Sequence, residues 1–274
     1  MKTQTVTPNQ NQNDQEKRIK DNLSIIKNRI VIFSGKGGVG KSTVATNLSY
    51  TLLRNYKDIG LLDADITGPN IPKMVGENGQ PFAKDKKTIY PVEKNGLKLI
   101  SIAPMIPKDQ AVIWRGPLRT GVITQFLSDV VWGKLDILIS DLPPGTGDEI
   151  LTLVQKVTPQ IAIIVTTPQE ISLQDCRRAI NMAKKLNIPK IGVVENMSGL
   201  ICPHCGKSID FFGKGGGKKM AKKMDVEFLG SIPMEMKNRE CGDDGTPIVL
   251  KYPDSLTSKA FDEITKNVEK LLDK

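Results

Sequence analysis

The sequence contains no apolar run long enough to cross a bilayer, only four cysteines, and few aromatic residues. A membrane-spanning helix needs about 20 predominantly apolar residues, so we expect a cytoplasmic protein with no membrane partner. Four cysteines in 274 residues do not indicate a disulfide scaffold. The opening stretch, MKTQTVTPNQNQNDQEKR, lacks the apolar core of a signal peptide and the Arg-rich amphipathic pattern of a transit peptide. These absences favour an ordinary globular chain.

The net charge of +9 allows attraction to nucleic acid or acidic partners. However, the lysines are scattered along predicted solvated helix faces, as in AKKMD and NMAKKLN. No aromatic residues are interleaved with them to stack bases. We therefore expect no specific nucleic-acid partner.

Short β-branched runs alternate with amphipathic segments along most of the chain, and this alternation is typical of a parallel sheet with crossover helices. The predicted buried strands are residues 29–34, 58–63, 97–102, 135–140, 161–166, 190–195 and 226–231. Residues 42–55 and 172–187 are predicted crossover helices. No break in composition divides this region. The sequence therefore predicts one α/β domain over residues 29–274, three-layered and doubly wound with a mostly parallel sheet, after a flexible polar tail over residues 1–28.

The closing segment, residues 255–274, predicts an amphipathic helix. Its apolar face carries Leu256, Phe261, Ile264, Val268 and Leu271. Because the polar face mixes acidic residues with lysines, we expect this helix to pack on the core and not on a membrane surface.

The stretch GKGGVGKST follows the first predicted strand and opens a helix, which is the context of a phosphate-binding loop, or P-loop. Its glycines let backbone N–H groups surround phosphate oxygens, Lys41 reaches the outer phosphates, and the Ser42 hydroxyl can ligate Mg²⁺. A purely structural glycine-rich turn would need neither of these side chains. The residues expected to bind ATP here are Gly35, Lys36, Gly37, Gly38, Val39, Gly40, Lys41, Ser42 and Thr43.

Carboxylates follow two other predicted strands of the sheet. Asp141 ends an apolar strand and is typical of a Walker B aspartate, held next to Mg²⁺ through a water. The PPGTGD stretch after it is expected to sense the γ-phosphate. Asp63 ends the second strand and Asp65 follows it, where a carboxylate can orient water or a metal shell. Asp65 is the candidate for this role, because Asp63 can instead be an N-cap or a structural hydrogen-bond acceptor. Asn196, after the sixth strand, is able either to read adenine or to form a turn.

The stretch CPHCG places Cys202 and Cys205 three positions apart, so both sulfurs can face one metal. Zinc or a four-iron cluster needs about four ligands, which two copies of this pair would supply in a dimer. The residues alone leave zinc and iron–sulfur both open. We expect His204 to point away from the metal, and Cys176 and Cys241 to act as packing or surface residues.

Two resemblances extend this interpretation. With Lys36, the loop resembles the deviant Walker A sequence, KGGxGK[ST], of the MinD/ParA/nitrogenase-iron-protein group of ATPases. The resemblance implies a homodimer in which Lys36 reaches the nucleotide of the other subunit. It also implies that Asp65, in DAD-x-x-G, positions the attacking water and that Asn196 reads adenine.

With DADITGPNIPKMVG, DLPPGTGDEILTL and ENMSGLICPHCGKSIDFFGKGGG in order, residues 29–274 resemble the Mrp/ApbC family of iron–sulfur cluster carrier ATPases. This implies a slow ATPase using ATP and Mg²⁺. It would hold a labile [4Fe–4S] cluster between Cys202 and Cys205 of two subunits, receive it from an assembly scaffold and pass it to apoproteins. We expect neither the extra N-terminal domain of many bacterial members nor the N-terminal cysteine motif of eukaryotic ones, because residues 1–28 are a polar stretch without cysteine. A ParA/MinD-like positioning ATPase and a zinc-bridged dimeric scaffold are the alternatives.

Overall fold

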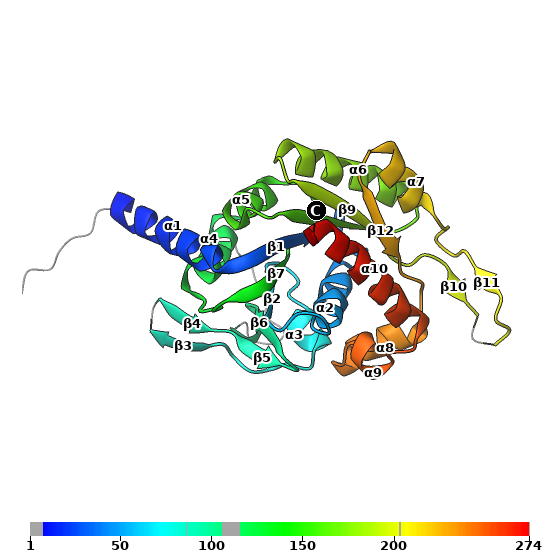
Figure 1. Cartoon of the computed structure of the whole chain (residues 1–274), viewed down its shortest axis with the longest axis horizontal. Coiled ribbons are helices and arrows are strands. Elements are labelled where there is room, and N and C mark those ends of the chain that lie inside the picture. The colour runs from blue at the N-terminus through cyan, green and yellow to red at the C-terminus, as the bar shows by residue number, and fades with distance from the viewer. Residues whose placement is uncertain (1–7, 86, 106–115, 203, 274) are drawn as a thin grey trace, which may run out of the picture.

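The computed structural model describes residues 8–85, 87–105, 116–202 and 204–273. An eight-stranded sheet forms its centre (Figure 1). Every neighbouring pair of strands is parallel except the last, in which β5 runs antiparallel to β6. In spatial order the strands are β12 (Glu227–Ser231), β9 (Lys190–Glu195), β8 (Ile161–Thr166), β1 (Ile26–Phe33), β7 (Leu135–Asp141), β2 (Ile59–Asp63), β6 (Leu97–Ile100) and β5 (Val92–Lys94). The predicted parallel sheet is confirmed, and β5 is an addition to it.

Helices cover both faces of the sheet, and each face has its own apolar core (Figure 1). Successive side chains of β1 alternate between the two cores: Val31 and Phe33 enter one, Ile30 and Ile32 the other. The first core is covered by α1 (Pro8–Ser24), α4 (Gly116–Asp129), α5 (Asp148–Val157), α6 (Glu170–Lys185) and α7 (Gly216–Lys223). The second is covered by α2 (Lys41–Leu52), α3 (Ile71–Met74), α8 (Met236–Asp244), α9 (Ile248–Lys251) and α10 (Leu256–Asp273). The predicted three-layer α/β architecture is confirmed.

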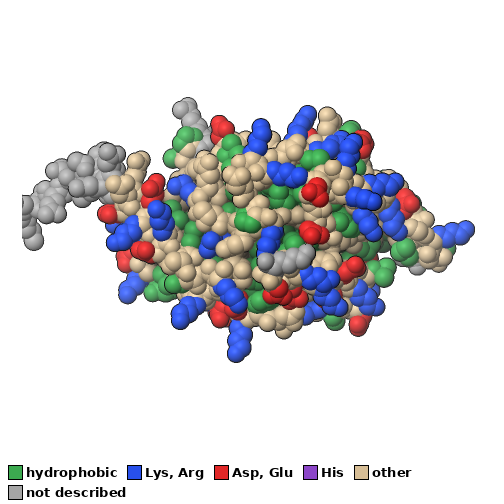
Figure 2. Space-filling model, turned by 45° about the horizontal axis from the view of Figure 1, so that its top comes forward, with side chains coloured by type: hydrophobic (Ala, Val, Ile, Leu, Met, Phe, Trp, Pro, Cys, Tyr) green, Lys and Arg blue, Asp and Glu red, His purple; other side chains and the backbone are tan. Residues whose placement is uncertain are grey.

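The closing helix α10 packs on β12 and α2. Four of its five predicted apolar contacts are buried, and the prediction for Leu256 is wrong because that side chain is 48% exposed in the first turn. Among the described residues, no helix is long and apolar enough to cross a membrane. On the face in Figure 2, lysine and arginine side chains are spread widely, with acidic side chains between them.

Two small antiparallel pairs lie outside the main sheet and were not predicted. One joins β3 (Phe82–Asp85) to β4 (Thr88–Tyr90), ahead of a 3-10 turn at Ala103–Met105. The other joins β10 (Leu200–Ile201) to β11 (Ser208–Ile209) and carries the cysteine pair. Figure 1 shows this second pair projecting from the body of the molecule. We call residues 200–209 the cysteine hairpin.

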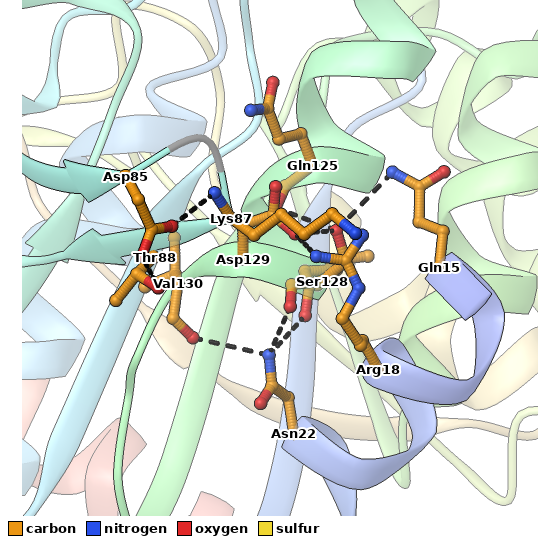
Figure 3. A network of polar contacts seen from close by, with 11 residues as sticks. Gln15, Arg18, Asn22, Asp85, Lys87, Thr88, Gln125, Ser128, Asp129 and Val130 are labelled. Atoms are coloured by element: carbon orange, nitrogen blue, oxygen red, sulfur yellow. Dashed lines mark hydrogen bonds and ion pairs between the residues drawn. The ribbon is translucent and has the colours of Figure 1, made fainter. Parts of the chain in front are cut away.

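The prediction of a flexible tail is wrong for residues 8–28, because they form α1 and the start of β1. Ile19 and Leu23 are buried in the core beside α4. The Arg18 guanidinium also makes a 2.7 Å ion pair with Asp129 at the end of α4 (Figure 3). The helix is polar in composition, so its few apolar residues gave a weak sequence signal, and its other partners lie on a distant segment. Residues 1–7 lie outside the described part of the chain.

Asn22 caps the carboxyl end of α4, and its loss is expected to destabilise the protein. Its amide Nδ2 lies 3.2, 2.9 and 3.4 Å from the carbonyl oxygens of Leu127, Ser128 and Val130 (Figure 3). We expect Asn22→Ala to lower the unfolding free energy by about 1–2 kcal/mol in urea titrations, because the carbonyls of Leu127 and Ser128 lose this donor. Gln15→Ala, which removes one 3.4 Å contact, is the control with an expected loss within about 0.5 kcal/mol. Equal losses in both variants would contradict the capping role.

Candidate functional site

The P-loop joins the carboxyl end of β1 to the first turn of α2, as the motif predicts. Gly38 and Gly40 have φ values of +79° and +82°, in the left-handed region that favours glycine. A cavity of about 190 Å³ lies over the loop. It is lined by Ser34, Gly37, Gly38, Gly40, Lys41, Ser42, Thr43, Asp65, Gly68, Asn70, Met74 and Pro144. The loop therefore presents its glycine backbone and its lysine to one open space.

The structure brings together the predicted residues Lys41, Ser42, Asp65 and Asp141 from three segments of the chain. Lys41 Nζ lies 2.9 Å from Asp141 Oδ2 and 3.6 Å from Asp65 Oδ2. Ser42 Oγ donates a 2.6 Å hydrogen bond to the same Asp141 oxygen. The three charged side chains are almost wholly buried. This convergence follows from the strand order, because β7 lies between β1 and β2 and all three end at the same edge.

One carboxylate oxygen of Asp141 has no hydrogen-bond partner among the described residues and could bind a metal. Its carboxylate is wholly buried, and Oδ1 has no hydrogen-bond partner within the described structure. A buried carboxylate oxygen without a partner is costly, and here it sits on the same side chain that contacts the Ser42 hydroxyl. Carboxylate and hydroxyl oxygens are the hard ligands that Mg²⁺ prefers. The donor set therefore fits Mg²⁺.

Asp63 occupies a structural position next to this cluster. It pairs in register with Asp141, accepts a 2.9 Å hydrogen bond from the Ser101 hydroxyl, and accepts another from the Asp65 N–H. Burial, reinforced by the charge of Asp141, raises the pKa of Asp63 to about 8. Sequence reasoning missed Ser101, although it also follows a parallel strand at this edge of the sheet.

We expect Asp63→Asn to change the pH dependence of stability in nucleotide-free, Mg²⁺-free protein. Because the folded pKa of about 8 lies above the ordinary 3.8, the contribution of Asp63 to stability is complete below 3.8 and is lost as pH rises through 8. Asparagine does not titrate. The unfolding free energy of the variant, relative to that of wild type, should therefore rise by up to about 1.4 kcal/mol per pH unit between pH 3.8 and 8. Urea titrations at several pH values measure the difference, and a pH-independent difference would contradict the prediction.

Asn196 lies against the P-loop. Its amide Nδ2 donates a 2.9 Å hydrogen bond to the carbonyl oxygen of Val39, and the side chain is buried. Asn196 also borders a largely apolar cavity of about 540 Å³ that reaches Gly40 and Thr43. Residues of the β12–α8 segment, among them Pro233, Met234 and Met236, form much of its remaining wall. The cavity is continuous with the loop and large enough for a planar base.

The cysteine pair lies in the turn of the cysteine hairpin. Cys202 N–H donates to the Lys207 carbonyl, and the Gly206 N–H donates back to the Cys202 carbonyl, each at 2.9 Å. Cys202 is half-buried and Cys205 is exposed. Hydrogen bonds from the backbone of Cys205, and then of His204, lower the pKa of the Cys202 thiol. The turn therefore favours the thiolate form that binds metals.

The other cysteines do not join this pair. Cys176 in α6 and Cys241 in α8 are buried, and burial raises the pKa of Cys176 to about 12 and raises that of Cys241 as well. Across the described ranges, no three His, Cys, Asp or Glu side chains are grouped so as to hold a metal ion. Within the described part of the chain, Cys202 and Cys205 therefore have no third His, Cys, Asp or Glu side chain grouped with them.

The fold and the site together define a P-loop nucleoside triphosphatase. The family model of the NUBPL iron-transfer P-loop NTPases matches residues 25–269, and the chain belongs to that family. It is 54% identical over 264 residues to an iron-sulfur cluster carrier protein of Methanocaldococcus jannaschii, covering 95% of this chain and 89% of the relative. It is 43% identical to the iron-sulfur cluster transfer protein NUBPL of Dictyostelium discoideum, covering 90% of this chain and 77% of the relative.

Solved structures agree with this assignment. A nucleotide-binding protein from Archaeoglobus fulgidus in complex with ADP matches with a TM-score of 0.74 and 38% identity, covering 84% of this chain and 91% of the other. The cell division ATPase MinD of Pyrococcus furiosus matches with a TM-score of 0.65 and 26% identity, covering 89% and 99%. The predicted resemblances to the MinD/ParA group and to the iron–sulfur carriers are confirmed.

Proposed function

We propose that the protein is a cytoplasmic, ATP-hydrolysing carrier of a labile [4Fe–4S] cluster. Two copies of the chain hold the cluster between their Cys202 and Cys205 thiolates. They receive it from an assembly scaffold and deliver it to apoproteins. The observation that carries the proposal is an accessible pair of thiols on a projecting hairpin of a P-loop ATPase, with no third ligand on the described chain. The names of the iron-sulfur carrier relatives support the choice of cargo.

In this proposal the nucleotide takes over the contacts that Lys41 makes with carboxylates. The glycine backbone holds the phosphates, and Lys41 turns from Asp141 and Asp65 toward the outer phosphate oxygens. Ser42 and Asp141, the latter through a water, would hold Mg²⁺, which neutralises phosphate charge when bound. Asp65, released from Lys41, orients the attacking water.

Recognition and dimerisation involve two further residues. Asn196 is placed beside both the loop and the apolar cavity, where its amide can turn to the edge of adenine. Lys36 makes no ion pair among the described residues, and we assign its ammonium to the nucleotide of the partner subunit. A charge supplied from the partner stabilises the transition state only in the dimer, which ties hydrolysis to assembly.

Anaerobic reconstitution of the full chain with iron and sulfide tests the proposal. We expect an iron–sulfur absorption band, about four iron and four sulfide per dimer, and cluster transfer to an apoprotein that takes a [4Fe–4S] cluster. Reconstituted protein that is dimeric but holds tightly bound zinc would favour the zinc-bridged scaffold. Protein that holds no metal would leave only the nucleotide-dependent ATPase.

A further inference from the structure

Glu195, which the predicted mechanism does not use, is a wholly buried acid at the end of β9. Its Oε1 accepts hydrogen bonds from Ser198 Oγ at 2.5 Å, Gly215 N–H at 2.9 Å and Ser231 Oγ at 3.5 Å. Its Oε2 accepts from Gly217 N–H at 2.5 Å. A buried carboxylate is tolerated only with such donors, so its position depends on all of these segments.

The glycine-rich run GKGGGKK at the start of α7 has the composition of an anion-binding loop, and Glu195 is the anion that it binds. A Cβ atom on Gly217 would lie 3.0 Å from Glu195 Oε2, so glycine permits the close approach. Two N–H groups at the amino-terminal end of α7, those of Gly215 and Gly217, are therefore bound by a carboxylate of the same chain.

Both ends of the segment that contains the cysteine hairpin return to this carboxylate. Ser198 precedes the hairpin and Gly215 follows it, while Cys202 and Cys205 lie between them at its tip. Near its base, the Met234 N–H also donates a 2.8 Å hydrogen bond to the Gly199 carbonyl. Glu195 thus holds both ends of this segment by hydrogen bonds, while the hairpin between them projects from the molecule (Figure 1).

Asn196, the residue after Glu195, contacts the P-loop. Asn196 donates to the carbonyl of Val39, and a Cβ atom on Gly40 would lie 2.2 Å from its Nδ2. The following residue, Met197, has a φ of +57°, an uncommon backbone conformation for a non-glycine residue. The Asn196 side chain therefore lies in direct contact with the loop at Val39 and Gly40, one residue away from Glu195.

We propose that Glu195 is a positioning residue that couples nucleotide binding at the P-loop to the position of the cysteine hairpin. The inference rests on the proposed function, since the hairpin matters only if it carries cargo. Nucleotide contacts with the loop shift Asn196. Glu195 transmits the shift to both ends of the hairpin at once through Ser198, Gly215 and Gly217. The paired thiols then move as one unit, which changes how two subunits can share a ligand.

Hydrogen–deuterium exchange of the full, metal-free chain tests this coupling without any cluster. In wild type, we expect Mg²⁺–ADP to change amide exchange in residues 199–212 by about fivefold or more, the lower end of ordinary allosteric coupling. Glu195→Gln keeps the size of the side chain but replaces one acceptor oxygen with an amide donor that opposes the N–H groups. This variant should bind ADP while exchange in the hairpin becomes independent of nucleotide. Ser231→Ala, which removes only the longest contact, is the matched control and should keep the nucleotide effect.

The outcomes separate coupling from a merely structural role. If Glu195→Gln raises hairpin exchange equally with and without ADP, and so keeps the nucleotide-dependent ratio, the proposal is overturned. Wild type that binds ADP and assembles a cluster but shows no change in the hairpin also overturns it, while the proposed function survives. Failure of cluster assembly with intact coupling would instead remove the proposed function. If Glu195→Gln does not fold, Ser198→Ala must reduce the nucleotide effect, and an unchanged effect there counts against the coupling.

Discussion

Replacing both hairpin cysteines, Cys202→Ala/Cys205→Ala, is expected to abolish the iron–sulfur absorption band after reconstitution. The reconstituted variant should also have a smaller dimer fraction than reconstituted wild type, because no cluster bridges its subunits. The chain then offers no thiolate at the hairpin, and the remaining two cysteines are buried with raised pKa values. Iron and sulfide content should fall from about four of each per dimer to background. Stability should change little, because Cys205 is exposed and Cys202 is half-buried.

The double variant Cys176→Ala/Cys241→Ala is the matched control. It also removes two thiols, but these are buried and lie away from the hairpin. It should keep the absorption band and the dimer mass, whatever stability it loses through the cavities it creates. A band that persists without Cys202 and Cys205, or that is lost only in the control, would place the cluster elsewhere. Equal loss in both variants would indicate damage to folding, which urea titration of the metal-free proteins detects.

The sequence predicts those parts of the molecule whose pattern lies within one short stretch of the chain. The strand β8, IAIIVT, reads as a buried strand by itself, and the P-loop is recognisable from glycine spacing before Lys41 and Ser42. Asp141 and Asp65 could be placed near the loop because parallel strands end at a common edge. Their catalytic roles stay predictions.

The features that escaped prediction depend on contacts between distant segments. Helix α1 is stabilised by residues more than 100 positions away, including the pair of Arg18 with Asp129. Strand β5 has three residues and pairs only at the edge of the sheet. Glu195 looked like the end of a buried strand, and its role appears only when the chain returns at Gly215 and Gly217. Hydrophobic periodicity in the sequence does not predict contacts of this kind between distant segments.

Replacing the P-loop lysine, Lys41→Gln, is expected to reduce steady-state ATP hydrolysis by about 100-fold or more, because a preorganised charge aimed at the phosphates is lost. The same change removes the cation that lies 2.9 Å from Asp141 and 3.6 Å from Asp65. Burial already raises the pKa of Asp141, and Lys41 opposes that rise. Without Lys41 the folded pKa climbs further above the ordinary value. The variant should therefore lose unfolding free energy relative to wild type as pH rises, which urea titrations at several pH values measure.

Lys36→Gln is the matched control, because it removes the same charge from the same loop at a half-buried side chain that makes no ion pair within the described residues. If the ammonium of Lys36 acts on the partner's nucleotide, this variant should also lose hydrolysis, yet its unfolding free energy should stay within about 0.5 kcal/mol of wild type at every pH. Both variants would then hydrolyse ATP more slowly, but only Lys41→Gln would change the unfolding free energy. A Lys41→Gln protein that hydrolyses ATP at the wild-type rate would show that phosphate charge is neutralised by another residue. A Lys36→Gln protein that hydrolyses normally while dimeric would remove the contribution across the interface and leave each subunit catalytically independent.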